Sequence, residues 1–501
     1  MSTVVQVAEK FHSKTEAWDL KAYVLGALFY RYISEDLTKF LHSHEHASGN
    51  HGFDYSKVSD TDAELGRSDT IDEKGYYILP SQLFSAVRER ADDDENLNET
   101  LEAVFTAISS SAKGTASEHA FVGLFGNFNP NSETLGDTVA KRNQRLAKLL
   151  TDIGNFHLED AAADFDELLR YYVTNAGKKG GDHFTPPTIA QLVARLAIAA
   201  NPKARTIYDP AFGSGSLLIE GRRRLGRDST RVFGQELVLT NYHMARMNLL
   251  LHDIGYDSFD LAGGISTLTA PAHEADQPFD IIVSNPKWST PWEGKDNPLL
   301  INDERFAPAG VLAPKQYHDL AFTMHAVSWL SSNGVAVLVQ FPGTLYRGNA
   351  EATIRRYLVD SNLVDAVIQL PPDWGYGVTV PGCIIVLRRA KSDNAVLFID
   401  ASRVFKRVGN KNEMQEVHQK TVVDAFLARE DVDHFSRLVS AEEIEAREFD
   451  LSVSRYVQSP RDREPVDIFL LNGRIADIVK HQIELRNEID AIVADLEGVE
   501  A

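Results

Sequence analysis

A glycine-rich turn lies where a predicted strand, 206–209, passes into a predicted helix, 217–225. The turn reads Tyr208-Asp209-Pro210-Ala211-Phe212-Gly213-Ser214-Gly215-Ser216. Glycines let the backbone approach a ligand closely, and a helix N-terminus directs free N–H groups toward it. The turn has neither the Gly-Lys-Ser/Thr of a P-loop nor a full Gly-x-Gly-x-x-Gly pattern. It indicates a nucleotide-like ligand, with a purely structural turn as the alternative.

An acidic residue follows at the end of the next predicted strand, 232–236. Glu236 lies 21 residues beyond Gly215. A carboxylate about 20 residues after such a turn, at a strand end, is placed to accept hydrogen bonds from ribose hydroxyls. The spacing therefore favours a ribose-binding role over an ordinary exposed glutamate.

A third motif places two hydrogen-bond acceptors directly after a buried strand, 279–284. The motif reads Asn285-Pro286-Lys287-Trp288, and its proline takes the chain out of the sheet. The Asn285 side-chain carbonyl and the Pro286 backbone carbonyl can together hold an exocyclic amino group. Trp288 can stack on a base. Asn-Pro is also a common turn, which is the alternative for the isolated tetrapeptide.

A fourth motif, Gly180-Gly181-Asp182-His183-Phe184-Thr185-Pro186-Pro187, precedes the first helix of the predicted sheet region. Thr185 before two prolines suits a helix N-cap, and the segment could equally close over a ligand. Alternating histidines, at His42, His44, His46 and His51, lie in a polar segment at 42–72. That segment is expected to be a solvated loop, because no cysteine or carboxylate completes a zinc spacing. No metal is expected in the protein.

The elements that position these motifs change in character along the chain. Residues 1–155 predict helices, and large apolar residues cover more than one face of the segment 15–40. From 156 to 405, valine- and isoleucine-rich runs alternate with amphipathic helices, which predicts a doubly wound, mainly parallel α/β sheet. Residues 406–501 end in an amphipathic helix at 466–496 that must cover its apolar stripe with its own core or a partner. The predicted strands are 206–209, 232–236, 279–284, 335–341, 366–370 and 383–387, with an edge strand at 396–398.

Composition places the chain among soluble globular proteins. It has 501 residues, 43% hydrophobic and 25% charged, which excludes disordered, collagen-like and membrane-spanning classes. The net charge is 51 − 72 = −21, so a partner or a local basic face must attract any nucleic acid. Cys383 is the single cysteine, and no secretory leader is evident, so a cytoplasmic location is expected.

Together the motifs resemble the modification (HsdM) subunit of type I restriction–modification systems, an N6-adenine DNA methyltransferase. The order of the blocks is typical of the gamma class: a Phe-Tyr-Thr-Pro-like motif, the glycine-rich motif, then Asn-Pro-x-aromatic. The resemblance implies a Rossmann-like methyltransferase domain at 156–405. It also implies an all-helical N-terminal domain at 1–155 and a C-terminal docking region at 406–501. The similar stretches include 18–33, 177–186, 234–254, 302–314, 341–348 and 370–387.

The resemblance further implies site residues and partners. The methionine half of S-adenosylmethionine lies against the glycine-rich turn and the Thr-Pro motif, and its ribose against Glu236. Asn285 and Pro286 accept hydrogen bonds from the adenine amino group, and Trp288 stacks on the flipped base. A specificity (HsdS) subunit reads the DNA, two modification subunits clamp the double-stranded DNA, and a restriction (HsdR) subunit can join. The implied cofactor-binding residues are Phe184, Thr185, Pro186, Asp209, Pro210, Gly213, Ser214, Gly215 and Glu236.

Several positions depart from the family pattern. Lys287 replaces a second proline, Trp288 a smaller aromatic residue, and Ile265 an aspartate that touches the cofactor's adenine. His183 replaces an aromatic residue, and Phe184 lacks a tyrosine hydroxyl. These departures leave open a degenerate, non-catalytic scaffold of the same complex. The acceptor pair also suits cytosine N4, RNA or protein glutamine, although the whole-chain resemblance favours adenine in DNA.

Overall fold

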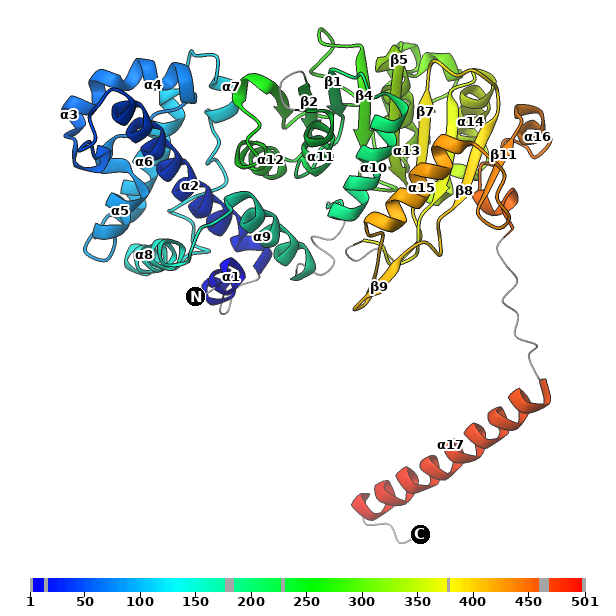
Figure 1. Ribbon diagram of the computed structural model, residues 1–501. Helices are drawn as coiled ribbons and strands as arrows, with labels where there is room; N and C mark the ends of the chain where they lie inside the picture. The colour runs from blue at the N-terminus through cyan, green and yellow to red at the C-terminus, as the bar shows by residue number, and fades with distance from the viewer. Residues whose placement is uncertain are drawn as a thin grey trace. The chain divides into compact units, whose positions relative to one another are not determined.

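The computed structural model describes residues 3–12, 17–175, 184–226, 230–375, 379–458 and 468–497 (Figure 1). Contacts divide the chain into two compact units, Met1–Gln458 and Ser459–Ala501. The boundaries predicted at 155 and 405 both fall inside the first unit and stay predictions. Within the described residues, no helix is both long enough and apolar enough to cross a membrane.

The N-terminal part of the first unit is helical, as predicted. The long helix α2 is buried over several faces because apolar residues surround its first half, including Leu20, Val24 and Phe29. The helices here are α1 (Val4–His12), α2 (Ala17–Ala47), α3 (Asp60–Ala63), α4 (Arg67–Lys74), α5 (Phe84–Arg90), α6 (Leu97–Ser111), α7 (Glu118–Phe121), α8 (Val139–Asn155) and α9 (Ala161–Asn175).

The prediction of a solvated loop at 42–72 is wrong. Helix α2 continues through His42, His44 and His46 to Ala47, His51 lies in the turn beyond it, and short helices follow. The His42 ring accepts a hydrogen bond from the Tyr55 backbone N–H at 3.0 Å. The Tyr55 side chain is itself buried and donates to the Ile78 carbonyl at 2.8 Å. Long-range packing of Tyr55 thus orders a segment whose local composition is that of a loop.

The sheet has nine strands in the order β11-β8-β6-β7-β5-β4-β1-β2-β3. The pairs β1–β2, β2–β3, β1–β4, β4–β5 and β6–β8 are parallel, which confirms the mainly parallel α/β class. The strands are β1 (Thr206–Asp209), β2 (Arg231–Glu236), β3 (Phe259–Gly263), β4 (Phe279–Ser284), β5 (Leu330–Gln340), β6 (Val364–Gln369), β7 (Cys383–Arg388), β8 (Val396–Asp400) and β11 (Ser436–Val439).

Helices cover both faces of the sheet, and each face has its own apolar core. One core joins helices α10, α11, α12 and α15 to the N-terminal helices. The other lies under α13, α14 and α16. The carboxyl ends of the parallel strands therefore remain as the edge from which functional loops emerge. The helices are α10 (Pro187–Ala200), α11 (Ser216–Leu225), α12 (Leu239–Leu251), α13 (Asp319–Trp329), α14 (Ala350–Asp360), α15 (Glu416–Ala428) and α16 (Ala441–Glu445); the second unit is α17 (Ile468–Glu497).

Candidate active site

A cavity of about 350 Å³ opens at the carboxyl ends of β1, β2 and β4. This is the edge at which doubly wound sheets bind ligands. Five of the residues predicted from the motifs line it: Pro210, Gly213, Glu236, Asn285 and Pro286. Three separate motifs of the sequence therefore converge on one cavity of cofactor size.

Asp209 lies behind the cavity wall and ties the glycine-rich turn to the strand that carries Asn285. Its Oδ1 accepts hydrogen bonds from the Ala211 N–H at 2.9 Å and the Ser284 hydroxyl at 2.7 Å. Its Oδ2 is buried and has no hydrogen-bond partner. Burial, with a smaller contribution from the Glu236 charge, raises the pKa of Asp209 to about 7. The protein itself therefore leaves the hydrogen-bonding capacity of this oxygen unused.

Glu236 closes the glycine-rich turn from the end of β2. Its carboxylate accepts from the Gly213 N–H and from the Val238 N–H, both at 2.9 Å. Burial raises its pKa, while these backbone donors favour the ionised form. Each carboxylate oxygen has a second lone-pair direction, so the group can still accept from a ligand hydroxyl.

Gly215 fits the turn because its φ is +80° and an added Cβ would lie 2.7 Å from Leu249 Cδ1. The left-handed φ disfavours any side chain, and the close approach adds a steric clash. Gly215 and Ser214 do not line the cavity; they form the support beneath its wall. The Ser214 carbonyl accepts from the Asn248 side-chain amide at 3.0 Å, which fixes the turn to α12.

Asn285 is oriented by the Thr-Pro motif. Its Nδ2 donates to the Thr185 hydroxyl at 3.0 Å. Because the amide nitrogen is used in this way, Oδ1 remains the free acceptor of the side chain. Thr185 is not the N-cap that its sequence context suggested: Pro186 occupies the N-cap position of α10, without a side-chain cap, and the Thr185 hydroxyl accepts from Asn285 instead. Phe184 is partly buried against the core. Residues 176–183, including His183, lie outside the described residues, so the first part of this motif stays a prediction.

The loop after Asn285 is held by two residues at the start of α13 that the motifs do not reveal. The His318 Nε2 donates to the Lys287 carbonyl at 2.6 Å. The buried Asp319 carboxylate accepts the Ser289 N–H at 3.1 and 3.2 Å. Ser289 has φ +50°, a strained value for a residue with a side chain, so this hydrogen bond maintains a conformation that the loop alone would not favour.

Trp288 points into an aromatic cluster. Its ring lies 5.6 Å from that of Trp374 and 6.0 Å from that of Phe341. Gly382 makes room for this packing, because a Cβ there would lie 3.0 Å from the Trp288 ring. Trp288 is only partly buried, so its stacking role toward a base stays a prediction, and Trp374 is a neighbour that the motifs do not indicate.

The far wall of the cavity comes from residues without a motif signal. Most of them lie in the short loops after β2 and β3 or near the start of α13. The Thr267 hydroxyl donates to the Pro210 carbonyl at 2.6 Å and joins the loop after β3 to the glycine-rich turn after β1. Ile265, at the position where the family has aspartate, is 44% exposed and does not line the cavity. The lining residues of this wall include Leu237, Val238, Asn241, Ser266, Leu268, Thr269 and Phe322.

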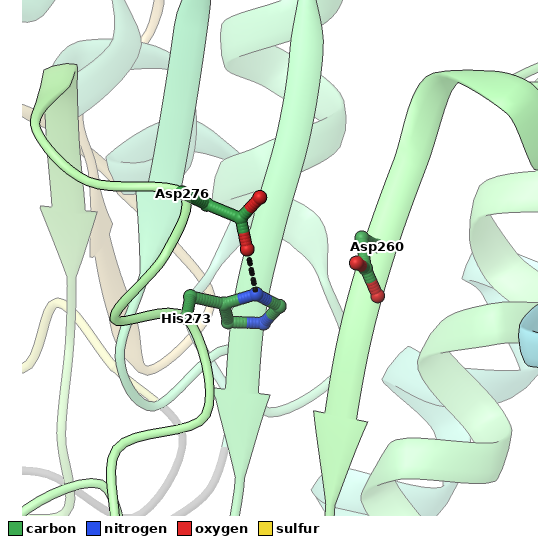
Figure 2. A group of neighbouring side chains, drawn as sticks. All are labelled: Asp260, His273 and Asp276. Carbon is green, nitrogen blue, oxygen red and sulfur yellow. Dashed lines mark hydrogen bonds and ion pairs between the residues drawn. The ribbon is translucent and has the colours of Figure 1, made fainter.

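A cluster of Asp260, His273 and Asp276 lies beside the loop that carries part of this wall (Figure 2). One ligand atom from each residue lies within 4.8 Å of the others. His273 already uses both ring nitrogens, one with the Gly234 carbonyl at 3.0 Å and one with Asp276 at 3.2 Å. The His273 ring is buried, and its hydrogen bond to Gly234 fastens the loop after β3 to strand β2. This structural role explains the histidine.

Two family models match the chain. Residues 159–465 match the family described as N-6 DNA Methylase, and residues 1–153 match the HsdM N-terminal domain. The two matches are consecutive, and together they extend over nearly all of the first unit.

Individual relatives agree with the family models. The chain is 37% identical to the type I restriction enzyme MpnII methylase subunit of Mycoplasma pneumoniae, over 98% of this chain and 95% of the relative. It is 28% identical to the MjaVII methylase subunit of Methanocaldococcus jannaschii, over 68% of this chain and 60% of that protein. The structure of a type I restriction-modification methyltransferase subunit from Streptococcus thermophilus superposes with a TM-score of 0.81. That structure is 31% identical in sequence, and the match covers 91% of this chain and 98% of the other.

Proposed function

Because this chain belongs to the N-6 DNA methylase family, as an adenine-N6 DNA methyltransferase subunit of the type I restriction–modification kind, we propose that its cavity binds S-adenosylmethionine. We further propose that Asn285 and Pro286 hold the target amino group. The observation that carries the proposal is the convergence of the glycine-rich turn, Glu236 and Asn285 on one cavity, with Asp209 buried behind its wall.

The residues around the cavity fit this cofactor. The buried, unpartnered Oδ2 of Asp209 suits the cationic amino group of the methionine half. Glu236 suits the ribose hydroxyls, and the apolar side chains of Leu237, Val238 and Leu268 suit an adenine ring. Pro210, Gly213, Ser214 and Gly215 would form or support the turn beneath the methionine half.

The chemistry at Asn285 is that of positioning. S-adenosylmethionine, when bound, supplies an electrophilic methyl group on a sulfonium. The two N–H groups of the adenine amino group donate hydrogen bonds to the Asn285 Oδ1 and the Pro286 carbonyl. This arrangement localises the lone pair on N6, where it can attack the methyl group. Thr185 fixes the Asn285 amide in the orientation that this requires. A preorganised acceptor pair lowers the barrier without reorganisation at the moment of transfer.

The departures from the family pattern are compatible with catalysis. Lys287 lacks the stiffness of a proline, but its carbonyl accepts a hydrogen bond from His318. The Ser289 N–H, two residues further on, donates to Asp319. The loop is therefore fixed by hydrogen bonds where a second proline would fix it by its ring. This bracing favours an active enzyme over a degenerate scaffold.

The chain belongs to the subunits of type I restriction–modification complexes, and we propose the details of its assembly. A specificity subunit reads the sequence, two copies of this chain clamp the double-stranded DNA, and a restriction subunit can join. The net charge of −21 agrees with a subunit that does not select DNA by itself. We propose the bacterial or archaeal cytoplasm as the location of the complex, because its proposed substrate is DNA.

The pH dependence of cofactor affinity tests the proposed cofactor site. Asp209 has a pKa of about 7 and must ionise to pair with the cofactor's ammonium group. We expect the affinity for S-adenosylmethionine, measured by titration calorimetry, to rise between pH 5.5 and 7 by up to about tenfold per unit. The Asp209→Asn variant, which keeps the shape and loses the charge, should bind more weakly at pH 7 and show a shallower curve. The pKa of Glu236 is also raised, so its titration should leave a smaller pH dependence of cofactor affinity in the variant.

Two results would contradict this assignment. One is a curve for Asp209→Asn that is parallel to the wild-type curve. The other is wild-type affinity that falls as the pH rises to 7. Thermal unfolding of the cofactor-free proteins is the control. The raised pKa makes protonated Asp209 favour the folded state, so wild-type stability should decline as the pH rises from the ordinary value of 3.8 to about 7 and level off above it, and the variant should lose this decline.

A further inference from the structure

A partly buried arginine, Arg347, lies beside the Asn285 loop (residues 285–290). It follows β5 after the short 3-10 helix η10 (Pro342–Leu345), and β5 pairs in parallel with β4, which leads into Asn285. The two segments therefore leave the same edge of the sheet from neighbouring strands. The Arg347 side chain is 22% exposed, so most of its surroundings belong to the protein itself.

The Arg347 guanidinium lies over two aromatic rings. Its Cζ is 4.0 Å from the ring centroid of Tyr317 and 5.0 Å from that of Phe341. Stacking on ring faces restricts the orientation of the flat guanidinium and adds a cation–π attraction. Gly343 leaves room for this packing, because a Cβ there would lie 2.6 Å from Phe341 Cε1 and 2.7 Å from Arg347 Nε. A side chain at position 343 would have to displace one of these groups.

A buried carboxylate pairs with Arg347. The Oε1 of Glu351, in the first turn of α14, lies 3.5 Å from the Arg347 Nη1, and the Glu351 side chain is 2% exposed. Burial raises the pKa of Glu351, and the Arg347 charge opposes this rise. A buried charge is costly unless another group compensates it, so the ion pair ties Arg347 to α14.

Arg347 connects the Asn285 loop to this anchor. Its Nη2 donates to the Ser289 Oγ at 3.5 Å. Ser289 is the loop residue with φ +50°, and this contact adds to the hydrogen bond from its N–H to Asp319. Phe341, under the guanidinium, also packs against Trp288, with the ring centroids 6.0 Å apart. Two consecutive loop residues are therefore linked to Arg347, one directly and one through Phe341.

We propose that Arg347 is a positioning residue for methyl transfer, which fixes Trp288 and Ser289 and thereby keeps Asn285 aligned with the cavity. The inference rests on the proposed function of the Asn285 loop. Arg347 is not among the residues that line the cavity, so it acts through the loop. Because transfer depends steeply on the alignment of the reacting groups, a displacement of about 1 Å in the loop is enough to slow the reaction.

Replacing Arg347 with methionine tests the proposal in the complex of this chain with its specificity subunit. Arg347→Met keeps an unbranched side chain and removes the guanidinium. Single-turnover transfer of a labelled methyl group should slow by roughly 10²-fold. Calorimetric affinity for S-adenosylmethionine should stay at the wild-type value, because Asp209 and Glu236 carry the proposed cofactor contacts. Amide hydrogen exchange should show a loss of protection in the peptide that contains Ser289.

Two further variants separate positioning from a loss of stability. Arg347→Met with Glu351→Met also removes the carboxylate that the single variant leaves buried without its partner. This double variant should recover the wild-type unfolding transition and still transfer slowly. Arg356→Met is the matched control, since Arg356 is exposed on the same helix and lies over another ring, 4.7 Å from that of Phe449. It should transfer methyl groups at the wild-type rate.

Several results would overturn the positioning role of Arg347. They are wild-type transfer by Arg347→Met, recovery of transfer in the double variant, and a loss of cofactor affinity that parallels the loss of transfer. A salt slope of DNA binding reduced by about 0.9 in Arg347→Met would identify a phosphate contact instead. If the wild-type complex transfers no methyl group, the proposed function fails, and hydrogen exchange still decides whether Arg347 fixes the loop: unchanged protection in Arg347→Met would refute it.

Discussion

Replacing Asn285 with alanine should reduce methyl transfer roughly 10²–10³-fold or more, the scale at which one preorganised hydrogen-bonding group at a reacting centre contributes. Asn285 supplies one of the two acceptors for the target amino group, and its orientation is fixed by Thr185 at 3.0 Å. Affinity for S-adenosylmethionine should remain nearly unchanged, because Asp209 and Glu236 carry the proposed cofactor contacts. Single-turnover transfer of a labelled methyl group and calorimetric cofactor binding measure the two effects separately.

Asn394→Ala is the matched control for this variant. Asn394 also uses its side-chain amide in a hydrogen bond, to Glu442, but at an exposed position of another loop. It should transfer methyl groups at the wild-type rate. Turnover retained by Asn285→Ala would contradict the role assigned to Asn285. Loss of both transfer and cofactor affinity would show that the side chain supports the cavity rather than the amino group.

Removal of residues 466–501 should abolish assembly with the specificity subunit and leave the fold of the first unit intact. Helix α17 repeats exposed apolar residues at intervals of four and three, with the polar Gln482 at one position of the series, which is the spacing of a coiled-coil seam. Both apolar cores of the described chain consist of residues before 458, so the truncation removes no core residue. The apolar positions are Leu471, Ile475, Ile478, Leu485, Ile489 and Ile492.

A milder pair of substitutions tests the same surface without shortening the chain. The double variant Ile478→Asp, Leu485→Asp places two charges on the apolar seam. The control, Lys480→Ala with Glu484→Ala, also changes two residues, but both lie off the seam. Light scattering coupled to gel filtration should show a complex for the second variant and separate subunits for the first. Thermal unfolding of the isolated chains should give the same main transition for both. A complete complex formed by the truncated chain would refute the docking role.

Local sequence patterns predicted the strands that carry the site. The expected strands at 206–209 and 279–284 coincide with β1 and β4, because each is a compact apolar run bounded by a turn signal. Strand β3 was not predicted, since its sequence Phe-Asp-Leu-Ala-Gly is short and little different from a loop. The antiparallel direction of β7 has no signal in its own residues. It follows from the connection after β6, which contains no predicted helix that could return the chain for a parallel crossover.

The motifs singled out five residues that line one cavity, and the roles assigned to these residues stay predictions. Glu236 lines the cavity at the end of β2, its contact with the Gly213 N–H was not predicted, and its ribose-binding role stays a prediction. His318 and Asp319 were not identified as supports of the loop, because their partners are about 30 residues away and the contact depends on how α13 packs on the sheet. The helix itself was expected at 319–330, and strand β5 begins already at Leu330. These supporting hydrogen bonds depend on the packing of segments that are distant in sequence, so local motifs could not predict them.

The most direct test of the central claim is transfer of a tritiated methyl group to genomic DNA that lacks its native methylation. The purified chain is assayed alone and with its specificity subunit, and the modified bases are identified by chromatography. We predict N6-methyladenine only in the presence of the specificity subunit. No transfer by an assembled complex that binds S-adenosylmethionine would contradict the account and identify the chain as a non-catalytic scaffold.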